Sequence, residues 1–204
     1  MSLSIPELNQ FKKAPIEGME PLLANRWSPR AFKETPVKPA DLRLILEAAR
    51  WTASSSNLQP WRFIVGVRGT EAYDKIFATL VPFNQSWAGK AGVLLLGFSE
   101  TANSKGEPNA YALYDLGQAA ATLVAQATAL GLHAHSMGGF DHEAASKTFG
   151  LEKGYALGAV IAIGYQDEPS SITNEQMQQR EVAPRERKPL KEIALTALGT
   201  PFEG

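Results

Sequence analysis

The segment Ser54-Ser55-Ser56-Asn57-Leu58-Gln59-Pro60-Trp61-Arg62 is the stretch that decides how this chain folds and what it binds. It combines small hydroxyls, two amides and a rigid Pro-Trp corner. It also follows a predicted helix over residues 38–51, in which apolar residues recur at helical spacing from Leu42 to Ala49. Binding groups are commonly carried on loops that a rigid element positions. The segment therefore predicts a polar cradle for a ligand.

The composition predicts a single globular domain over residues 1–204. The chain has 204 residues, of which 44% are hydrophobic and 20% charged, enough for one sizeable core. Because its formal net charge is only -1, we expect neither nucleic acid nor a membrane as a partner. The absence of cysteine excludes disulfides, thiolate nucleophiles and cysteine-based metal sites. The N-terminus shows no signal-peptide pattern, so we expect a cytoplasmic protein.

The chain alternates predicted helices and strands up to about residue 165. Strands are expected over 62–67, 91–98, 133–137 and 155–165, and helices over 38–51, after Thr70, over 109–130 and from Asp141 to Gly150. The run 91–98 is apolar throughout and predicts a central strand buried on both faces. A loop is expected around Pro82 to Trp87. Residues 166–188 turn polar and predict an extended surface excursion, followed by a C-terminal extension.

The predicted helix over 109–130 is the longest periodic segment. Its apolar positions are Leu113, Tyr114, Gly117, Ala121, Val124 and Thr128. Small side chains at Gly117, Ala119, Ala120, Ala121, Ala125 and Ala127 spread over more than one face. One face can meet the core and the other a second subunit, although the same composition suits a helix central to a monomer.

Two basic clusters predict a phosphate site. Arg26-Trp27-Ser28-Pro29-Arg30 lies near the start of the chain, and Arg185-Glu186-Arg187-Lys188-Pro189-Leu190 lies near its end. Guanidinium forks and hydroxyls suit a phosphate. Taken alone, the first cluster is better explained as solvated surface charge, the second could be a solvated basic patch, and the serines could be ordinary loop residues. Their occurrence together with the cradle favours one ligand that carries both a phosphate and a heteroaromatic ring.

Gly138-Gly139 adds a further piece to the ligand site, and three other kinds of site are weighed and set aside: a Rossmann dinucleotide site, a metal site and a serine hydrolase site. Gly138-Gly139 lets the backbone approach a flat ligand, but no G-x-G-x-x-G opens a helix, which excludes a Rossmann dinucleotide site. His133 and His135 face one side of a strand, yet no carboxylate or further histidine at ligand spacing supports a metal site, and none is predicted. The serines lack a G-x-S-x-G elbow, so serine hydrolysis fits poorly.

These motifs, taken in order, resemble the FMN-dependent nitroreductase family. The pattern is Arg-x-Ser-x-Arg-x-Phe from Arg26, Ser-Ser-x-Asn-x-Gln-Pro-Trp from Ser54, Gly-Phe-Asp from Gly139 and Arg-x-Arg-x-Pro from Arg185. The resemblance covers most of the chain. It implies an α+β sandwich around a mostly antiparallel sheet flanked by helices, with the long helix at a homodimer interface.

The resemblance also implies a role for each motif. Arg26, Ser28, Arg185 and Arg187 would hold the FMN phosphate, and Arg30 would lie near the ribityl chain or the pyrimidine edge. Ser54, Ser55 and Asn57 would come from the partner subunit. Asn84 would meet the flavin's polar edge, and the Gly139 N–H would face N5. The full implied set is Arg26, Trp27, Ser28, Arg30, Ser54, Ser55, Asn57, Gln59, Asn84, Met137, Gly138, Gly139, Arg185 and Arg187.

The chain departs from common family patterns at three positions. Ala53 stands where many members have proline, Gly138 where some have an acidic residue, and Trp87 where some have lysine near the ring. These changes bear on substrate preference more than on flavin binding.

The activity implied by the resemblance is a ping-pong oxidoreductase reaction. NADH or NADPH would pass hydride to flavin N5 and leave, after which a nitroaromatic, quinone or similar acceptor would be reduced in the same slot. Such a reaction demands no side-chain acid or base, since the chemistry belongs to the cofactor. The alternatives are an FMN-binding protein without NAD(P)H turnover, used for flavin storage or sensing, and a structural domain without any cofactor.

Overall fold

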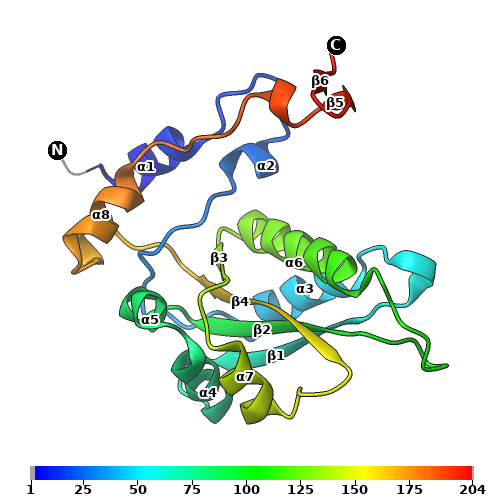
Figure 1. The fold of residues 1–204 in the computed structure, drawn as a ribbon. Helices are drawn as coiled ribbons and strands as arrows, with labels where there is room; N and C mark the ends of the chain where they lie inside the picture. Colours follow the sequence, from blue (N-terminus) through cyan, green and yellow to red (C-terminus); the bar gives the residue numbers. More distant parts are fainter. Residues whose placement is uncertain (1–2, 204) are drawn as a thin grey trace.

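A computed structural model of the chain describes residues 3–203. At its centre is an antiparallel sheet with strand order β1-β2-β4-β3 (Figure 1). The strands are β1 (Trp61–Val67), β2 (Val93–Glu100), β3 (His133–Met137) and β4 (Tyr155–Gly164). β2 lies inside the sheet, as its continuous apolar run predicted. The sheet and its helices confirm the expected α+β nitroreductase-like sandwich.

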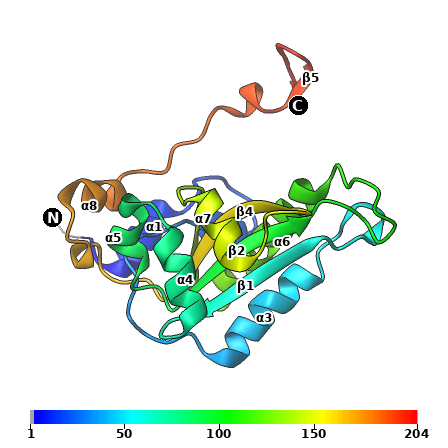
Figure 2. The same cartoon turned by 60° about the horizontal axis from the view of Figure 1, so that its bottom comes forward.

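Helices cover both faces of the sheet. α3 (Pro39–Arg50) and α6 (Ala112–Ala129) pack on each other and cover one face, while α4 (Glu71–Thr79) and α7 (His142–Phe149) cover the other (Figures 1 and 2). Side chains along β2 alternate between the two resulting cores. Val93 and Leu95 face the α3–α6 side, and Leu94 and Leu96 face the α4–α7 side. This two-sided burial is why the strand carries no polar side chain from Val93 to Phe98.

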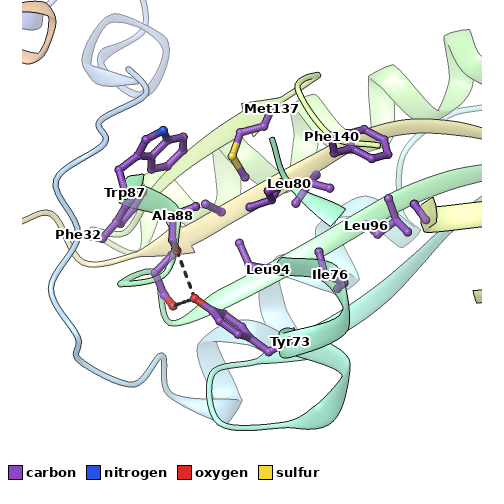
Figure 3. Close-up of a cluster of buried hydrophobic side chains, with 14 of the residues drawn as sticks. Phe32, Tyr73, Ile76, Leu80, Trp87, Ala88, Leu94, Leu96, Met137 and Phe140 are labelled. Atoms are coloured by element: carbon purple, nitrogen blue, oxygen red, sulfur yellow. Dashed lines mark hydrogen bonds between the residues drawn. The ribbon is translucent and has the colours of Figure 1, made fainter. Parts of the chain in front are cut away.

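The α4–α7 core extends to a short helix, α5 (Pro82–Ala88), where the sequence predicted a loop. Pro82 suits the first turn of a helix, because its ring fixes φ and that turn needs no donor. Trp87 stacks on Phe32 with ring centroids 6.2 Å apart (Figure 3). The Tyr73 hydroxyl donates to the carbonyls of Ala88 and Ala91 at 3.2 and 2.9 Å. Tertiary contacts thus stabilise a helix that is too short to show a helical repeat of apolar residues in the sequence.

The structure shows which face of α6 meets the core. The side chains packed on the sheet are those of Ala112, Leu116, Ala119, Leu123 and Ala127. Leu113 and Tyr114, which belong to the apolar pattern of this segment, are 52% and 68% exposed. The helix is therefore apolar on two faces, and only one of them is covered within this chain.

Segments from the two ends of the chain lie together on one side of the sheet, although the termini themselves lie far apart (Figure 1). They contribute α1 (Ile5–Lys12), α2 (Pro21–Asn25) and, within residues 166–188, a 3-10 turn η2 (Pro169–Ser171) and helix α8 (Glu175–Val182). The sequence predicted an extended excursion and missed α8, whose first turn is capped by the Asn174 side chain. Because α8 has few apolar residues, the sequence did not indicate that Met177 and Glu181 are buried.

The C-terminal residues extend away from the sandwich. A 3-10 turn η3 (Leu190–Glu192) and a small hairpin of β5 (Leu195–Ala197) and β6 (Thr200–Pro201) form this arm, which projects from the body in Figure 2. Leu190, Ile193 and Leu198 on it are exposed. Within residues 3–203, no helix combines the length and apolar character needed to cross a bilayer.

The central strand gives a direct test of the fold. Leu94 is fully buried, at 0% exposure, whereas Leu44 on the outer face of α3 is 50% exposed. We expect Leu94→Ala to lower the free energy of unfolding by about 2–5 kcal/mol, because it removes apolar contacts and leaves a cavity. Leu44→Ala is the matched control and should change it by about 0.5 kcal/mol or less. Urea unfolding of the two variants measures both, and equal losses would contradict the assigned core.

Candidate cofactor site

The structure brings the two basic clusters into one pocket. It lies between α1, the loop after α2, and the segment that follows α8, and we call it the cationic pocket. Its lining residues are Lys12, Arg26, Trp27, Ser28, Arg30, Arg180, Glu181, Arg185 and Arg187. Side chains more than 150 positions apart in the sequence therefore meet, as the phosphate interpretation required. Lys12, Arg180 and Glu181 were not among the predicted residues.

Hydrogen bonds to the backbone fix several of these cations. The Arg185 guanidinium donates from Nη1 to the carbonyls of Lys12 and Ala24 at 2.7 and 3.1 Å, which ties the chain end to α1 and α2. The Arg26 guanidinium donates to the Ser28 hydroxyl at 3.3 Å. Arg187 donates to the carbonyl of Glu186 at 2.7 Å. The pocket is thus held together by neutral acceptors, which leaves most of its positive charge uncompensated.

The electrostatics of the cationic pocket favour an anion. Burial lowers the pKa of Arg26, and the charge of Arg187 lowers it further. Burial likewise lowers the pKa of Arg30, with Glu181 opposing and Arg180 adding to the effect. The Arg30 Nε atom is buried and has no hydrogen-bond acceptor among residues 3–203. Guanidinium groups stay charged under such shifts, so a bound anion would relieve their repulsion.

Two histidines of β3 contact the loop that carries Arg26 to Arg30. His133 meets the Trp27 ring edge-on at 5.9 Å between centroids. His135 places Nδ1 2.9 Å from the Pro29 carbonyl and its ring 4.6 Å from that of Trp87. Burial, with the nearby arginines, lowers the pKa of both histidines to about 4. They are therefore neutral at pH 7, and the described residues hold no group of three or more metal-ligating side chains.

The Gly138-Gly139 segment follows β3 at its far end. The Gly139 carbonyl accepts the Asn84 side-chain amide at 2.8 Å and the Val81 N–H at 3.2 Å. A Cβ on Gly139 would lie 2.8 Å from Asn84 Nδ2, so a side chain there would displace the Asn84 amide. A Cβ on Gly138 would meet no described atom within 4 Å. Asn84 therefore fixes the backbone, and the Gly138 side stays open to a ligand.

Two other predicted residues already have partners in the chain. The Trp27 indole N–H donates to Asn9 Oδ1 at 2.8 Å, and Lys12 Nζ lies 4.9 Å from the ring centroid. Met137 is buried in the α4–α7 core. If Trp27 or Met137 contacts a ligand, it would do so through atoms that do not take part in these interactions.

The serine-rich segment lies away from the cationic pocket, near the N-terminal end of α6 (Figure 1). Ser54 opens a 3-10 turn, η1 (Ser55–Asn57), and the Ser55 N–H donates to the Asp115 carboxylate at 3.2 and 3.3 Å. Ser56, Asn57 and Gln59 have φ of 50°, 53° and 48°, a region that non-glycine residues seldom occupy. Such strain clusters at functional sites. The segment is thus a strained, outward-facing loop that does not reach this chain's own pocket.

Comparison with known proteins places the chain in a family. The family model described as the nitroreductase family matches residues 23–81 and 69–165, which together cover well over half of the sequence. The chain belongs to the nitroreductase family.

The chain is also similar to two solved structures and to one curated protein. A solved structure described as an oxidoreductase containing FMN is 35% identical, with a TM-score of 0.86, and the match covers 99% of this chain and 100% of that one. A putative nitroreductase in complex with FMN from Desulfovibrio desulfuricans is 24% identical, with a TM-score of 0.70 over 89% of this chain and 96% of that one. A 15.4 kDa protein of Mycolicibacterium smegmatis, described as uncharacterized, is 35% identical over 66% of this chain and 95% of its own length.

The two buried histidines predict a pH dependence of stability. Histidines in the unfolded chain titrate near pH 6.5, whereas His133 and His135 in the folded chain titrate at about 4. Between these values the unfolded state binds protons that the folded state does not, so stability is complete above pH 6.5 and falls as the pH drops toward 4. His133→Phe keeps the ring but removes one titrating group, and should flatten this fall. Urea unfolding of the variant and the parent at pH 7, 6, 5 and 4 measures it; identical slopes would contradict the burial of His133.

Proposed function

We propose that this chain is an FMN-dependent oxidoreductase that uses NADH or NADPH to reduce nitroaromatic, quinone or similar acceptors. The observation that carries the proposal is the cationic pocket at one end of β3, with the open Gly138-Gly139 backbone at the other. This spacing along a strand suits a ligand with a phosphate at one end and a flat ring at the other. The FMN named for the 35% identical structure supports the same cofactor.

The residues present fit FMN. Arg26, Ser28 and Arg187 supply guanidinium and hydroxyl donors that suit a phosphate monoester, and Arg30 has a buried Nε donor without a described acceptor. Gly139 offers an N–H that makes no hydrogen bond to residues 3–203. A flat ring can approach Gly138 because no side chain stands there. Positive charge and an N–H at the ring edge stabilise a ring that becomes more negative on reduction.

When bound, FMN supplies a ring that takes hydride from a reduced nicotinamide and passes electrons to an acceptor. The chain's own contribution is position and electrostatics. Asn84 donates to the Gly139 carbonyl and so helps to fix the backbone of Gly139, the residue that offers its N–H to the ring. Trp87 packs against Phe32 and His135. No side-chain acid or base is assigned. We propose that nicotinamide and acceptor use the open side of Gly138 in turn.

We further propose a homodimer in which each subunit completes the other's flavin site. The uncovered face of α6 forms an apolar groove with Leu22 and Leu23 of α2, and Gly117 and Ala121 line it. Arg26 lines both this groove and the cationic pocket, so a second copy seated on α6 would lie beside the cofactor. The strained Ser54–Gln59 loop, which does not reach its own pocket, is then available to the partner's site.

The cofactor and the reductant are tested together. We expect the purified protein to be yellow and its denatured supernatant to contain FMN rather than FAD. Anaerobic mixing with NADH or NADPH should then bleach the bound flavin, because a bound ring open at Gly138 is accessible to a nicotinamide. Stopped-flow absorbance measures the reaction. Bound FMN that neither nicotinamide bleaches would favour the flavin-storage or sensing alternative, and FAD would contradict the single-phosphate pocket.

The dimer is tested by charging the exposed face of α6. Ala121→Glu should shift the protein from dimer to monomer and weaken FMN binding, because it introduces an unpaired charge into a packed interface. Ala78→Glu is the matched control, since Ala78 is exposed on α4 at the opposite side of the sheet. Analytical ultracentrifugation with flavin absorbance measures both effects. A parent protein that sediments as a monomer with its full flavin content would contradict the shared site.

A further inference from the structure

A buried carboxylate lies at the base of the cationic pocket. Glu181 is 1% exposed and belongs to α8, the helix that the sequence did not indicate. Its Oε1 accepts the backbone N–H groups of Arg30 and Ala31 at 2.9 and 3.2 Å, and its Oε2 lies 3.0 Å from the Arg30 nitrogen. It thus binds the backbone of the loop whose side chains face the pocket.

The neighbouring contacts show that Glu181 is one of several groups that fix this loop. The Pro29 carbonyl is engaged by His135, and Lys12 Nζ donates to the Ala183 carbonyl at 2.5 Å, just after α8. Burial raises the pKa of the Glu181 carboxyl, while the N–H groups of Ala31 and Arg30 and the charges of Arg30 and Lys12 oppose that rise. Among these contacts, only the one from Glu181 satisfies the N–H groups of two successive residues of the loop.

We propose that Glu181 is a positioning residue, which holds the loop at Arg30–Ala31 so that Arg26 and Ser28 present their donors to a phosphate. The inference rests on the proposed FMN function and adds to it a residue that contacts the loop and not the cofactor. It also links cofactor affinity to the docking of α8, because α8 carries the carboxylate and the chain that follows it supplies Arg185 and Arg187.

A role of Glu181 through its charge and a role in positioning the loop predict opposite changes in phosphate affinity when the carboxylate is removed. If Glu181 acted only through its negative charge, removing that charge would make the pocket more positive and tighten phosphate binding. If Glu181 acts by holding the loop, removing its acceptor oxygens leaves two buried N–H groups without partners and weakens phosphate binding. The sign of the change in affinity therefore decides between the two roles.

The experiment compares Glu181→Met with Glu181→Gln. Methionine keeps the length and volume of the side chain but cannot replace the carboxylate as an acceptor, whereas glutamine keeps an oxygen that reaches both N–H groups and loses the charge. The apo proteins are titrated with FMN and with riboflavin, which shares the ring and ribityl chain but lacks the phosphate. Flavin fluorescence gives the dissociation constants. Glu175→Gln, an exposed change on the same helix, is the matched control.

We expect Glu181→Met to weaken FMN binding by about tenfold or more, the usual effect of losing hydrogen bonds to a charged group. Riboflavin binding should change much less, and Glu181→Gln and Glu175→Gln should bind FMN as tightly as the parent or more tightly. Tighter FMN binding by the methionine variant, equal loss of both flavins, or equal effects of methionine and glutamine would overturn the proposal. A parent protein that binds no FMN would instead refute the proposed function.

Discussion

The structure depends on one electrostatic constraint, the crowding of six cationic side chains around a pocket that contains a single carboxylate. Such an arrangement is unfavourable in a folded chain unless the backbone is held rigidly and an anion compensates the charge. The structure provides the first condition through contacts from every side of the loop from Arg26 to Ala31. β3 contributes its histidines, α1 contributes Asn9 and Lys12, and α8 contributes Glu181. The proposed FMN phosphate would provide the second.

The sandwich gives this loop its rigidity and its direction. β3 is an edge strand that pairs with β4, and it leads from the cationic pocket to Gly138 and Gly139. α5 packs against the same end of the sheet, so Asn84 reaches the Gly139 carbonyl. Trp87, where some family members have lysine, is buried with Phe32 and His135 and contributes packing instead of charge. On the proposed function, positive charge near the ring would then come from Arg30.

The sequence predicted those parts of the fold and of the site that depend on local patterns. β2 was recognisable because both of its faces are apolar, and the first arginine cluster because a serine and a tryptophan accompany it. α5 was missed because a helix of 7 residues is too short to show a period. Glu181 was missed because its importance comes from contacts with Arg30 and Ala31, 150 residues earlier in the chain. The face of α6 that the sheet covers could not be assigned from the sequence, because the helix is apolar on two faces and the pattern does not distinguish them.

A crystal structure of the protein with FMN tests the account most directly. The account predicts the phosphate within hydrogen-bond distance of Arg26, Ser28 and Arg187, the ring against Gly138 and Gly139, and a second copy on α6 whose Ser54–Asn57 loop contacts the same flavin. A phosphate bound elsewhere, with the cationic pocket filled only by solvent, would contradict it.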